Sequence, residues 1–385
     1  MLDRISQVNA PHAKRIFHTL DALRGIAAIA VVTLHYKDFF RPFAATHAYL
    51  AVDLFFIMSG VVIENAYASS FARGMGVLEF AKIRLIRLYP LYIVALAIAT
   101  LGAVGSFFGN NKSGFLDLQS LATSALTSLV FAPSPSTASG GYIFPLDPAF
   151  WSLLFELTVN ILYALLWSRL RSMRTLLLLM AASGAVVAMA GPYFGGIDFG
   201  PGRTDADMVI GFARATFGFL CGVALFRSAD LRAAPERAPT AVDLVGLLAV
   251  IGCVTPLLFQ KAGAWNGIVD AVAALLVFPA IVWCAMRIEL HGPLRGLSSI
   301  LGESSYAIYV LHLPVLAVAA AISARVGDPL VAGAPFSGVV VILVLIAGCW
   351  GLDKIYDAPA RRWLRERLAP RRDREALRKP LLRSA

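Results

Sequence analysis

The sequence predicts an all-α, polytopic integral membrane protein with about ten transmembrane helices and both termini in the cytoplasm. The first observation is composition: of the 385 residues, 58% are hydrophobic and only 15% are charged, whereas soluble domains average about 25% charged residues. The second is the recurrence of apolar stretches of spanning length, and the third is the one-sided distribution of Lys and Arg. A mean hydropathy of +0.72 excludes soluble, disordered and fibrous classes, because so much apolar surface cannot be hidden in water-soluble cores.

Ten apolar stretches are long enough to cross a bilayer, since about 20 residues are needed to span about 30 Å. Their approximate cores are 22–40, 48–66, 85–105, 149–168, 174–192, 208–226, 241–259, 265–286, 299–322 and 336–356. A weaker apolar run, 115–132, precedes the loop Pro133–Pro148, which is rich in proline and serine. Because counting this run as a span would break the charge pattern, we interpret it as a re-entrant or interfacial helix on the outer side.

The charge pattern sets the orientation. With the N-terminus in the cytoplasm, 27 of the 34 Lys and Arg residues fall on the inner side, 6 on the outer side, and Arg214 within a span. Without the ten cations of the C-terminal tail the ratio is still 17 to 6, as the positive-inside rule expects. The chain therefore divides into a cytoplasmic N-terminal segment (1–21), a ten-helix transmembrane domain (22–358) and a basic cytoplasmic tail (359–385). Orientation explains the net charge of +10, so we expect a lipid bilayer and no nucleic acid as partner.

Ionisable residues within spans are costly unless they face a protein-lined or aqueous interior. At about 1.5 Å per residue, five such side chains from five helices lie in a layer roughly 7–18 Å beneath the outer surface. They are His35, Asp53, Glu156, Arg214 and His312, with Tyr306 and Tyr309 on the turns below His312. The sequence therefore predicts a buried polar site.

A second group of charges lies at the inner end. Arg24 opens the first span, and Arg84 and Arg87 open the third at a spacing that puts them on one helix face. Arg24 and His35 also share a face, with about 16 Å between them along the helix. Because the planar guanidinium donates bidentate hydrogen bonds to phosphate, a phosphate-bearing cytoplasmic ligand with a long reactive arm would fit this spacing.

Each of these residues alone has a simpler interpretation. The arginines serve equally well as positive-inside anchors, and each histidine as a packed residue bonded to a backbone carbonyl. Asp53 and Glu156 are two carboxylates at similar depth that need partners, and the convergence of the whole set on one layer favours a site. The four cysteines lie in apolar segments without metal-type spacing, so we expect no metal.

Five motifs then follow one another along the spans. LDALRGIAAIAVVTLHY (Leu20–Tyr36) contains an arginine, a ten-residue gap and a histidine, as Arg24 and His35. The others, in chain order, are VDLFFIMSG (Val52–Gly60), RLIRLYPLY (Arg84–Tyr92), WSLLFEL (Trp151–Leu157) and SSYAIYVLH (Ser304–His312). In this order and on these spans they resemble the integral-membrane acyltransferase 3 family, which includes O-antigen and exopolysaccharide acetylases. The resemblance covers roughly residues 18 to 365.

The resemblance implies a membrane O-acyltransferase, with the acyltransferase domain at 22–358, that moves an acyl group from cytoplasmic acyl-CoA to a hydroxyl of a cell-surface or lipid-linked glycan. The acyl group is usually acetyl, so acetyl-CoA or another acyl-CoA is the implied co-substrate. The implied location is multi-pass in the cell inner (cytoplasmic) membrane, and a homo-oligomer is compatible with it. By the same analogy Arg24, Arg84 and Arg87 hold the CoA phosphates, and His35 works near the thioester. The candidates for acceptor or accessory roles are Ser59, Trp151, Arg214, Tyr306, Tyr309 and His312.

Acyl transfer to a sugar needs a base, because a hydroxyl is a poor nucleophile at neutral pH. Neutral imidazole has a suitable pKa of about 6.5, so we expect His35 to take the proton. Asp53 or Glu156 would orient its ring, as carboxylates do in catalytic triads. An acyl-His35 intermediate stays open as an alternative. Arg214 or Tyr309 is expected to steady the oxyanion or the sugar.

Two other function classes compete with acyl transfer. A transporter of a polar solute could use the same buried polar layer, although the sequence has no inverted repeat. A non-enzymatic scaffold would not account for five desolvated ionisable residues at similar depth. We expect the outer loops 106–148 and Tyr193–Asp207 to shape the acceptor's entrance.

Overall fold

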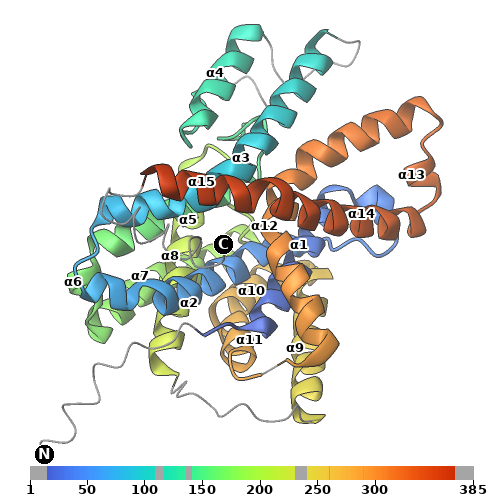
Figure 1. Ribbon diagram of the computed structural model, residues 1–385. Helices are drawn as coiled ribbons and strands as arrows, with labels where there is room; N and C mark the ends of the chain where they lie inside the picture. The colour runs from blue at the N-terminus through green and yellow to red at the C-terminus, as the bar shows by residue number, and fades with distance from the viewer. Residues whose placement is uncertain are drawn as a thin grey trace, which may run out of the picture.

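The computed structural model describes residues 15–108, 117–135, 141–229, 241–259, 261–288 and 290–368. The α-helices are α1 (His18–His35), α2 (Ala51–Ala72), α3 (Val77–Phe108), α4 (Leu118–Leu129), α5 (Phe150–Leu165), α6 (Trp167–Leu170), α7 (Met173–Phe194), α8 (Asp205–Ser228), α9 (Ala241–Phe259), α10 (Asn266–Val272), α11 (Phe278–Ala285), α12 (Gly292–Arg325), α13 (Pro329–Ala332), α14 (Phe336–Leu352) and α15 (Ala358–Leu368). Three 3₁₀ helices, η2 (Lys37–Phe40), η3 (Ala48–Leu50) and η4 (Gly263–Trp265), and two π-helical turns, η5 (Ala273–Val277) and η6 (Asp353–Asp357), connect or continue them. The long helices cross around a common centre, with α3 and α4 on one side of it and α9 and α11 on the other (Figure 1).

This architecture confirms the predicted all-helical, polytopic class. Among the described residues, 7 helical segments are long and apolar enough to cross a membrane, and α5 is a shorter apolar helix. Each of the ten predicted stretches contains a helix, while the number of crossings and the side of each terminus stay predictions. The helix α4 occupies the weak run 115–132, and its 12 residues are too few to cross about 30 Å. Parts of the predicted terminal segments, 1–14 and 369–385, lie outside the described residues.

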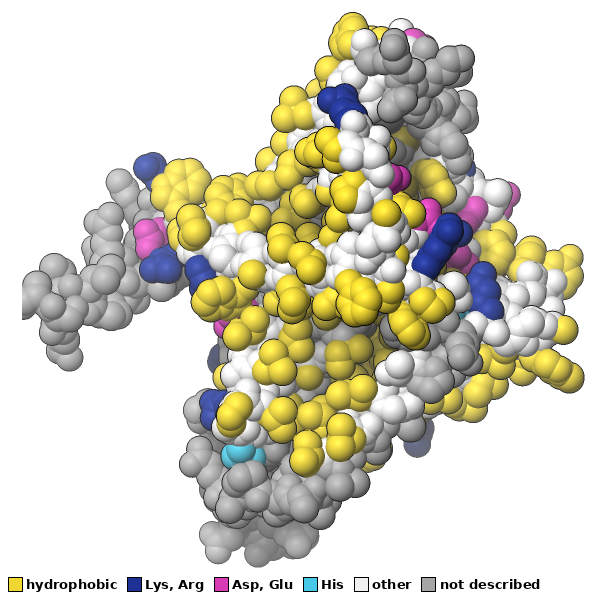
Figure 2. Space-filling model, turned by 90° about the vertical axis from the view of Figure 1, so that its right-hand side faces the viewer, with side chains coloured by type: hydrophobic (Ala, Val, Ile, Leu, Met, Phe, Trp, Pro, Cys, Tyr) yellow, Lys and Arg dark blue, Asp and Glu magenta, His cyan; other side chains and the backbone are white. Residues whose placement is uncertain are grey.

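The outer surface is apolar. Hydrophobic side chains cover much of the face in Figure 2, with Lys and Arg at scattered points. Leu101 on α3, Leu178 on α7 and Val344 on α14 are among the large apolar residues that stay exposed. Soluble proteins rarely leave contiguous apolar surface of this kind uncovered, so lipid is the solvent that this surface fits.

The helices α2 and α8 form the centre of the molecule. Buried residues make up 78% of the apolar stretch that contains α2 and 72% of the apolar stretch of α8, but only 22% of that in the segment Phe336–Leu368. A Cβ at Gly60 would lie 2.0 Å from the carbonyl oxygen of Phe219, and one at Gly222 would lie 2.0 Å from that of Ile57. Only glycine allows backbones to approach so closely. The glycines therefore allow α2 and α8 to pack closely.

The helices α1 and α12 lie side by side and run in the same direction. A Cβ at Gly302 would lie 2.5 Å from that of Asp21, and farther along both helices the ring of His35 contacts that of His312. The residue numbers of the contacting pairs therefore increase along both helices in the same direction. As a result, α1 and α12 present their histidines at the same level.

The start of α8 is fixed by its sequence. The Thr204 hydroxyl accepts a hydrogen bond from the backbone N–H of Asp207 at 3.1 Å, and the Asp207 carboxylate accepts one from the backbone N–H of Thr204 at 3.2 Å. This reciprocal pair satisfies donors that a helix start leaves unpaired. It sets the register in which Arg214, two turns on, points into the centre.

Candidate functional site

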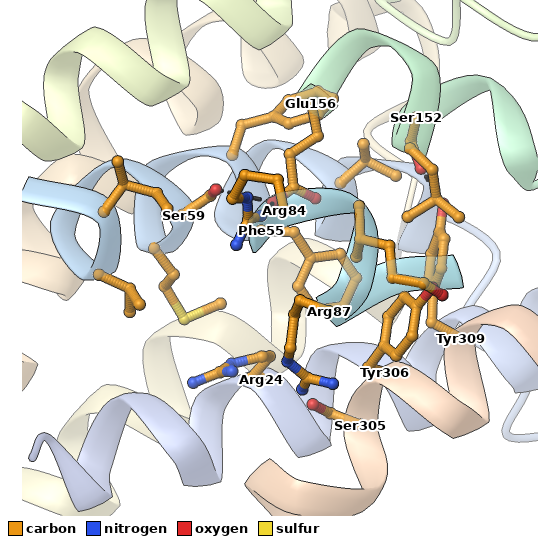
Figure 3. A pocket seen from close by; sticks show the side chains of 17 residues that line it. Arg24, Phe55, Ser59, Arg84, Arg87, Ser152, Glu156, Ser305, Tyr306 and Tyr309 are labelled. Atoms are coloured by element: carbon orange, nitrogen blue, oxygen red, sulfur yellow. Dashed lines mark hydrogen bonds and ion pairs between the residues drawn. The ribbon is translucent and has the colours of Figure 1, made fainter. Parts of the chain in front are cut away.

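Arg24, Arg84 and Arg87 line one pocket. The pocket lies between α1, α2, α3, α5 and α12, and its empty volume is about 860 Å³, open solvent at the mouth included. Figure 3 shows Arg24 and Arg87 together on one side of it, with Arg84 beside Glu156 on the other. Polar side chains complete the lining: Ser59, Ser152, Glu156, Ser305, Tyr306 and Tyr309. The structure therefore brings together the three arginines that the sequence singled out.

Arg84 is paired within the pocket. Its Nη2 donates to Glu156 Oε1 at 2.9 Å, and the Ser59 hydroxyl donates to the same oxygen at 2.8 Å. The Nε of Arg84 is buried and has no hydrogen-bond partner. Because an unpaired buried donor is costly, an anionic ligand that reaches this N–H would gain a hydrogen bond that the protein leaves open.

Arg24 and Arg87 keep donors free for a ligand. Arg24 donates to Asp21 at 2.7 Å, while Arg87 reaches Asp357 at only 3.4 Å and stacks over the ring of Tyr306. The two guanidinium side chains stay 30% and 29% exposed. A guanidinium has five N–H donors, so one carboxylate contact each leaves most of them available. Three such groups around one space form an anion site suited to phosphate.

Beyond the pocket, His35 and His312 face each other. The distance between Nδ1 of His35 and Nε2 of His312 is 3.2 Å, and the ring centroids are 5.0 Å apart. His312 is fully buried, whereas His35 keeps solvent-accessible surface. His35 does not line the arginine pocket, but Tyr309 does, and the carbonyl of Tyr309 accepts a hydrogen bond from His312 Nδ1 at 2.7 Å. Tyr309 thus joins the pocket to the histidine pair.

The hydrogen bonds assign the tautomers of both rings. A carbonyl oxygen only accepts, so the proton of His312 is on Nδ1, where Tyr309 binds it, and its Nε2 carries a lone pair. The Nδ1–H of His35 points at this lone pair and at the carbonyl of Val31, 2.9 Å away. The Nε2 of His35 is therefore the unprotonated nitrogen. It is the atom that can accept a proton.

Asp53 is engaged elsewhere. Arg214 donates from Nε to Asp53 Oδ1 at 3.1 Å and from Nη2 to Oδ2 at 2.7 Å, and both side chains are buried. Arg214 also donates to the backbone oxygens of Tyr49 and Phe199 and lies over the ring of Trp151. The expected contact of Asp53 or Glu156 with His35 is not among the contacts of the described residues. The close packing of α2 on α8 explains this, because it gives Asp53 an arginine partner.

Two charged residues of this region were not among the site residues expected from the sequence. Asp357, fully buried, contacts Arg87 and Arg361. Asp270, also fully buried, accepts hydrogen bonds from Tyr49 and His47. Asp357 stands in the charged stretch after the last predicted span, which was an available signal, whereas nothing local marks Asp270. No group of three or more His, Cys, Asp or Glu side chains that could hold a metal occurs in the part of the chain that the structure describes.

Comparison with known proteins decides the family. Residues 17–354 match the acyltransferase domain family known as acyltransferase 3. The chain belongs to this family. The protein is thus an acyltransferase with membrane-spanning helices, and the resemblance inferred from its motifs is confirmed.

Two relatives are similar to this acyltransferase. The "Protein 2 in picA locus" of Rhizobium radiobacter is 37% identical over 186 residues, which are 46% of this chain and 96% of that protein. The "Exopolysaccharide production protein ExoZ" of Rhizobium meliloti (strain 1021) is 27% identical over 284 residues, which are 72% of this chain and 79% of that protein. No solved structure matches the chain.

Proposed function

We propose that this acyltransferase moves an acetyl group from cytoplasmic acetyl-CoA to a hydroxyl of an exopolysaccharide or its lipid-linked precursor, in the inner (cytoplasmic) membrane. The observation that carries the proposal is the arginine pocket joined through Tyr309 to a histidine with one free ring nitrogen. An anion site next to a proton acceptor is the arrangement that transfer from a phosphate-bearing thioester needs.

The pocket is the donor site in this proposal. The 3′-phosphate and the pyrophosphate of CoA carry several negative charges, and Arg24, Arg84 and Arg87 supply donors around one space. The buried Nε–H of Arg84 gives one further bond. The thioester arm then extends toward Tyr309, with Phe55 packed against the Tyr309 ring at 5.5 Å between centroids. Tyr309 donates to the carbonyl oxygen of Ala149 at 3.3 Å, which fixes its position at this end of the pocket.

His35 is the general base. The acceptor hydroxyl gives its proton to Nε2 of His35 while its oxygen attacks the thioester carbonyl carbon. The carbon–sulfur bond then breaks, and the CoA thiolate takes the proton back from the imidazolium. General-base catalysis contributes about 10²–10⁴-fold in rate. His312 supports this step as a positioning residue, because it holds the His35 proton on Nδ1.

The glycan acceptor is inferred from sequence similarity to a relative. The relative named as an exopolysaccharide production protein aligns over 79% of its own length, so the similarity extends over most of that protein.

Reconstitution tests this proposal. The purified protein is placed in liposomes, and [¹⁴C]acetyl-CoA is supplied on the side of the arginine pocket. The acceptor is exopolysaccharide from the producing cells, freed of its esters by mild alkali. We expect ester-linked label on the polysaccharide with the wild type and a loss of at least about a hundredfold with His35→Ala. Movement of an unmodified solute without labelled polysaccharide would contradict the proposal and support a transporter.

A further inference from the structure

The segment Ile197–Gly200, between α7 and α8, is held by two buried charged residues, one on α10 and one on α8. The backbone N–H of Ile197 donates to Asp270 Oδ2 at 2.9 Å, and Arg214 Nη1 donates to the carbonyl of Phe199 at 2.9 Å. The side chains of Asp270 and Arg214 are fully buried. Buried charges make strong hydrogen bonds because little water competes for them. The backbone on both sides of Asp198 is therefore fixed.

Tight packing adds to this fixation. Gly200 has a φ of +134°, which L side chains rarely adopt. A Cβ at Gly200 would lie 2.2 Å from the ring of Trp151. The segment thus rests directly on α5, and its backbone has little freedom to move away.

The side chain of Asp198 has no such partner. In the described part of the chain it makes no hydrogen bond or ion pair, and it keeps solvent-accessible surface. Its neighbours Ile197 and Gly200 are buried. Two buried ionic groups therefore fix the backbone around a carboxylate whose own oxygens are left open.

The segment lies next to η3, which packs against α1, because Arg214 donates to the carbonyls of both Phe199 and Tyr49. The carboxylate of Asp198 and the ring of His35 interact electrostatically, and Arg214 and Lys261 also act on Asp198. The outer end of α1 is joined to the same region, because the Thr33 hydroxyl accepts from the backbone N–H of Ala45 at 2.9 Å. Both Asp198 and His35 are accessible to solvent. A ligand that enters from the solvent side can therefore contact both.

We propose that Asp198 binds the acceptor: its carboxylate accepts hydrogen bonds from glycan hydroxyls and holds one of them against Nε2 of His35. This inference rests on the proposed acetyl transfer. A carboxylate accepts several hydrogen bonds at once, so it suits neighbouring hydroxyls of one sugar ring. Two fixed groups are enough to orient the attacking oxygen, and a rigid backbone keeps them in place.

Three variants test the role of Asp198. Asp198→Ala removes the acceptor oxygens, and Asp198→Asn keeps the shape but loses the charge. Asp205→Asn is the matched control, because Asp205 is an exposed carboxylate at the end of the same loop without a hydrogen bond or ion pair among the described residues. The assay measures acetyl transfer to alkali-treated exopolysaccharide over a range of polysaccharide concentrations. Binding of CoA is measured separately by calorimetry.

We expect Asp198→Ala to lower kcat/KM for the polysaccharide roughly tenfold to a hundredfold, the effect of losing a hydrogen bond to a charged group. Asp198→Asn should show a smaller loss in the same direction, and CoA affinity should stay within about twofold for every variant. Asp205→Asn should match the wild type.

The outcomes separate the two proposals. If the wild type transfers acetyl and Asp198→Ala and Asp198→Asn both match it, Asp198 does not bind the acceptor and the proposed function stands. If the wild type transfers none, the proposed function itself fails. If Asp198→Ala loses CoA binding through misfolding, Asp198→Asn decides: unchanged acceptor kinetics in a variant that binds CoA would overturn the inference.

Discussion

The proposed roles of the two histidines, His35 as general base and His312 as positioning residue, lead to a quantitative prediction. His312→Leu removes the ring nitrogen that accepts from His35 and keeps a side chain of similar size in a fully buried position. His312→Gln is the matched control, because its amide oxygen can still accept a hydrogen bond. His35→Ala removes the base itself.

The structure gives the size of each effect. The Nδ1–H of His35 has two acceptors, Nε2 of His312 at 3.2 Å and the carbonyl of Val31 at 2.9 Å. His312→Leu removes only the longer contact, so it forfeits one neutral hydrogen bond, about 0.5–1.5 kcal/mol or about twofold to thirteenfold in rate. His35→Ala removes proton acceptance, which contributes about 10²–10⁴-fold. The two losses should differ by at least about tenfold.

The assay is the initial rate of acetyl transfer at saturating acetyl-CoA, with thermal unfolding in detergent as the folding control. We expect the order of rates to be wild type, His312→Gln, His312→Leu and, far below, His35→Ala. The reasoning would be refuted by a folded His312→Leu protein as inactive as His35→Ala, since His312 would then take the proton. A His312→Leu rate equal to that of the wild type would refute the positioning role.

Three further predictions concern the donor pocket, the loop before α5 and the central helix crossing. Arg87→Ala should weaken CoA binding about tenfold or more by calorimetry, and the exposed Arg73→Ala should not; equal losses would contradict a specific anion site. Burial raises the pKa of Asp147 to about 8, above about 3.9 in the unfolded chain, so the folded state loses stability as pH rises from about 4 to about 8. Asp147→Asn should therefore raise Tm over the wild type increasingly across this range, and Tm curves that stay parallel would argue against it. Gly222→Ala puts a Cβ 2.0 Å from a backbone oxygen of α2 and should lower Tm, whereas Gly102→Ala, with nothing within 4 Å, should not; the opposite order would contradict the crossing geometry.

Which side chains share one face of a helix could be predicted from the sequence, and which helices are neighbours could not. Arg84 and Arg87 were placed on one face by their spacing, and with Arg24 they do line one pocket. Asp53 was expected to orient the ring of His35, but it is paired with Arg214. The rise per residue fixes how far apart two residues lie along one helix. The partner of a side chain depends instead on which helices pack against it.

Neighbouring helices also decide the contacts that were not expected. The pairing of His35 with His312 requires α1 and α12 to lie side by side in parallel, and residues 277 positions apart give no local sign of this. Asp198 belongs to a loop that the sequence associated with the acceptor entrance. Its position is set by Asp270 on α10 and Arg214 on α8. These two hydrogen bonds to the loop backbone exist only in the assembled fold, so the sequence does not show them.

The most direct test of acetyl transfer dependent on His35 is the mass of the surface polysaccharide from cells that lack this protein and are complemented with either the wild type or His35→Ala. We predict that deletion removes acetyl groups from the polysaccharide repeating unit, that the wild type restores them, and that His35→Ala, present in the membrane at the same level, does not. Restoration of the acetylated mass by His35→Ala would contradict the account.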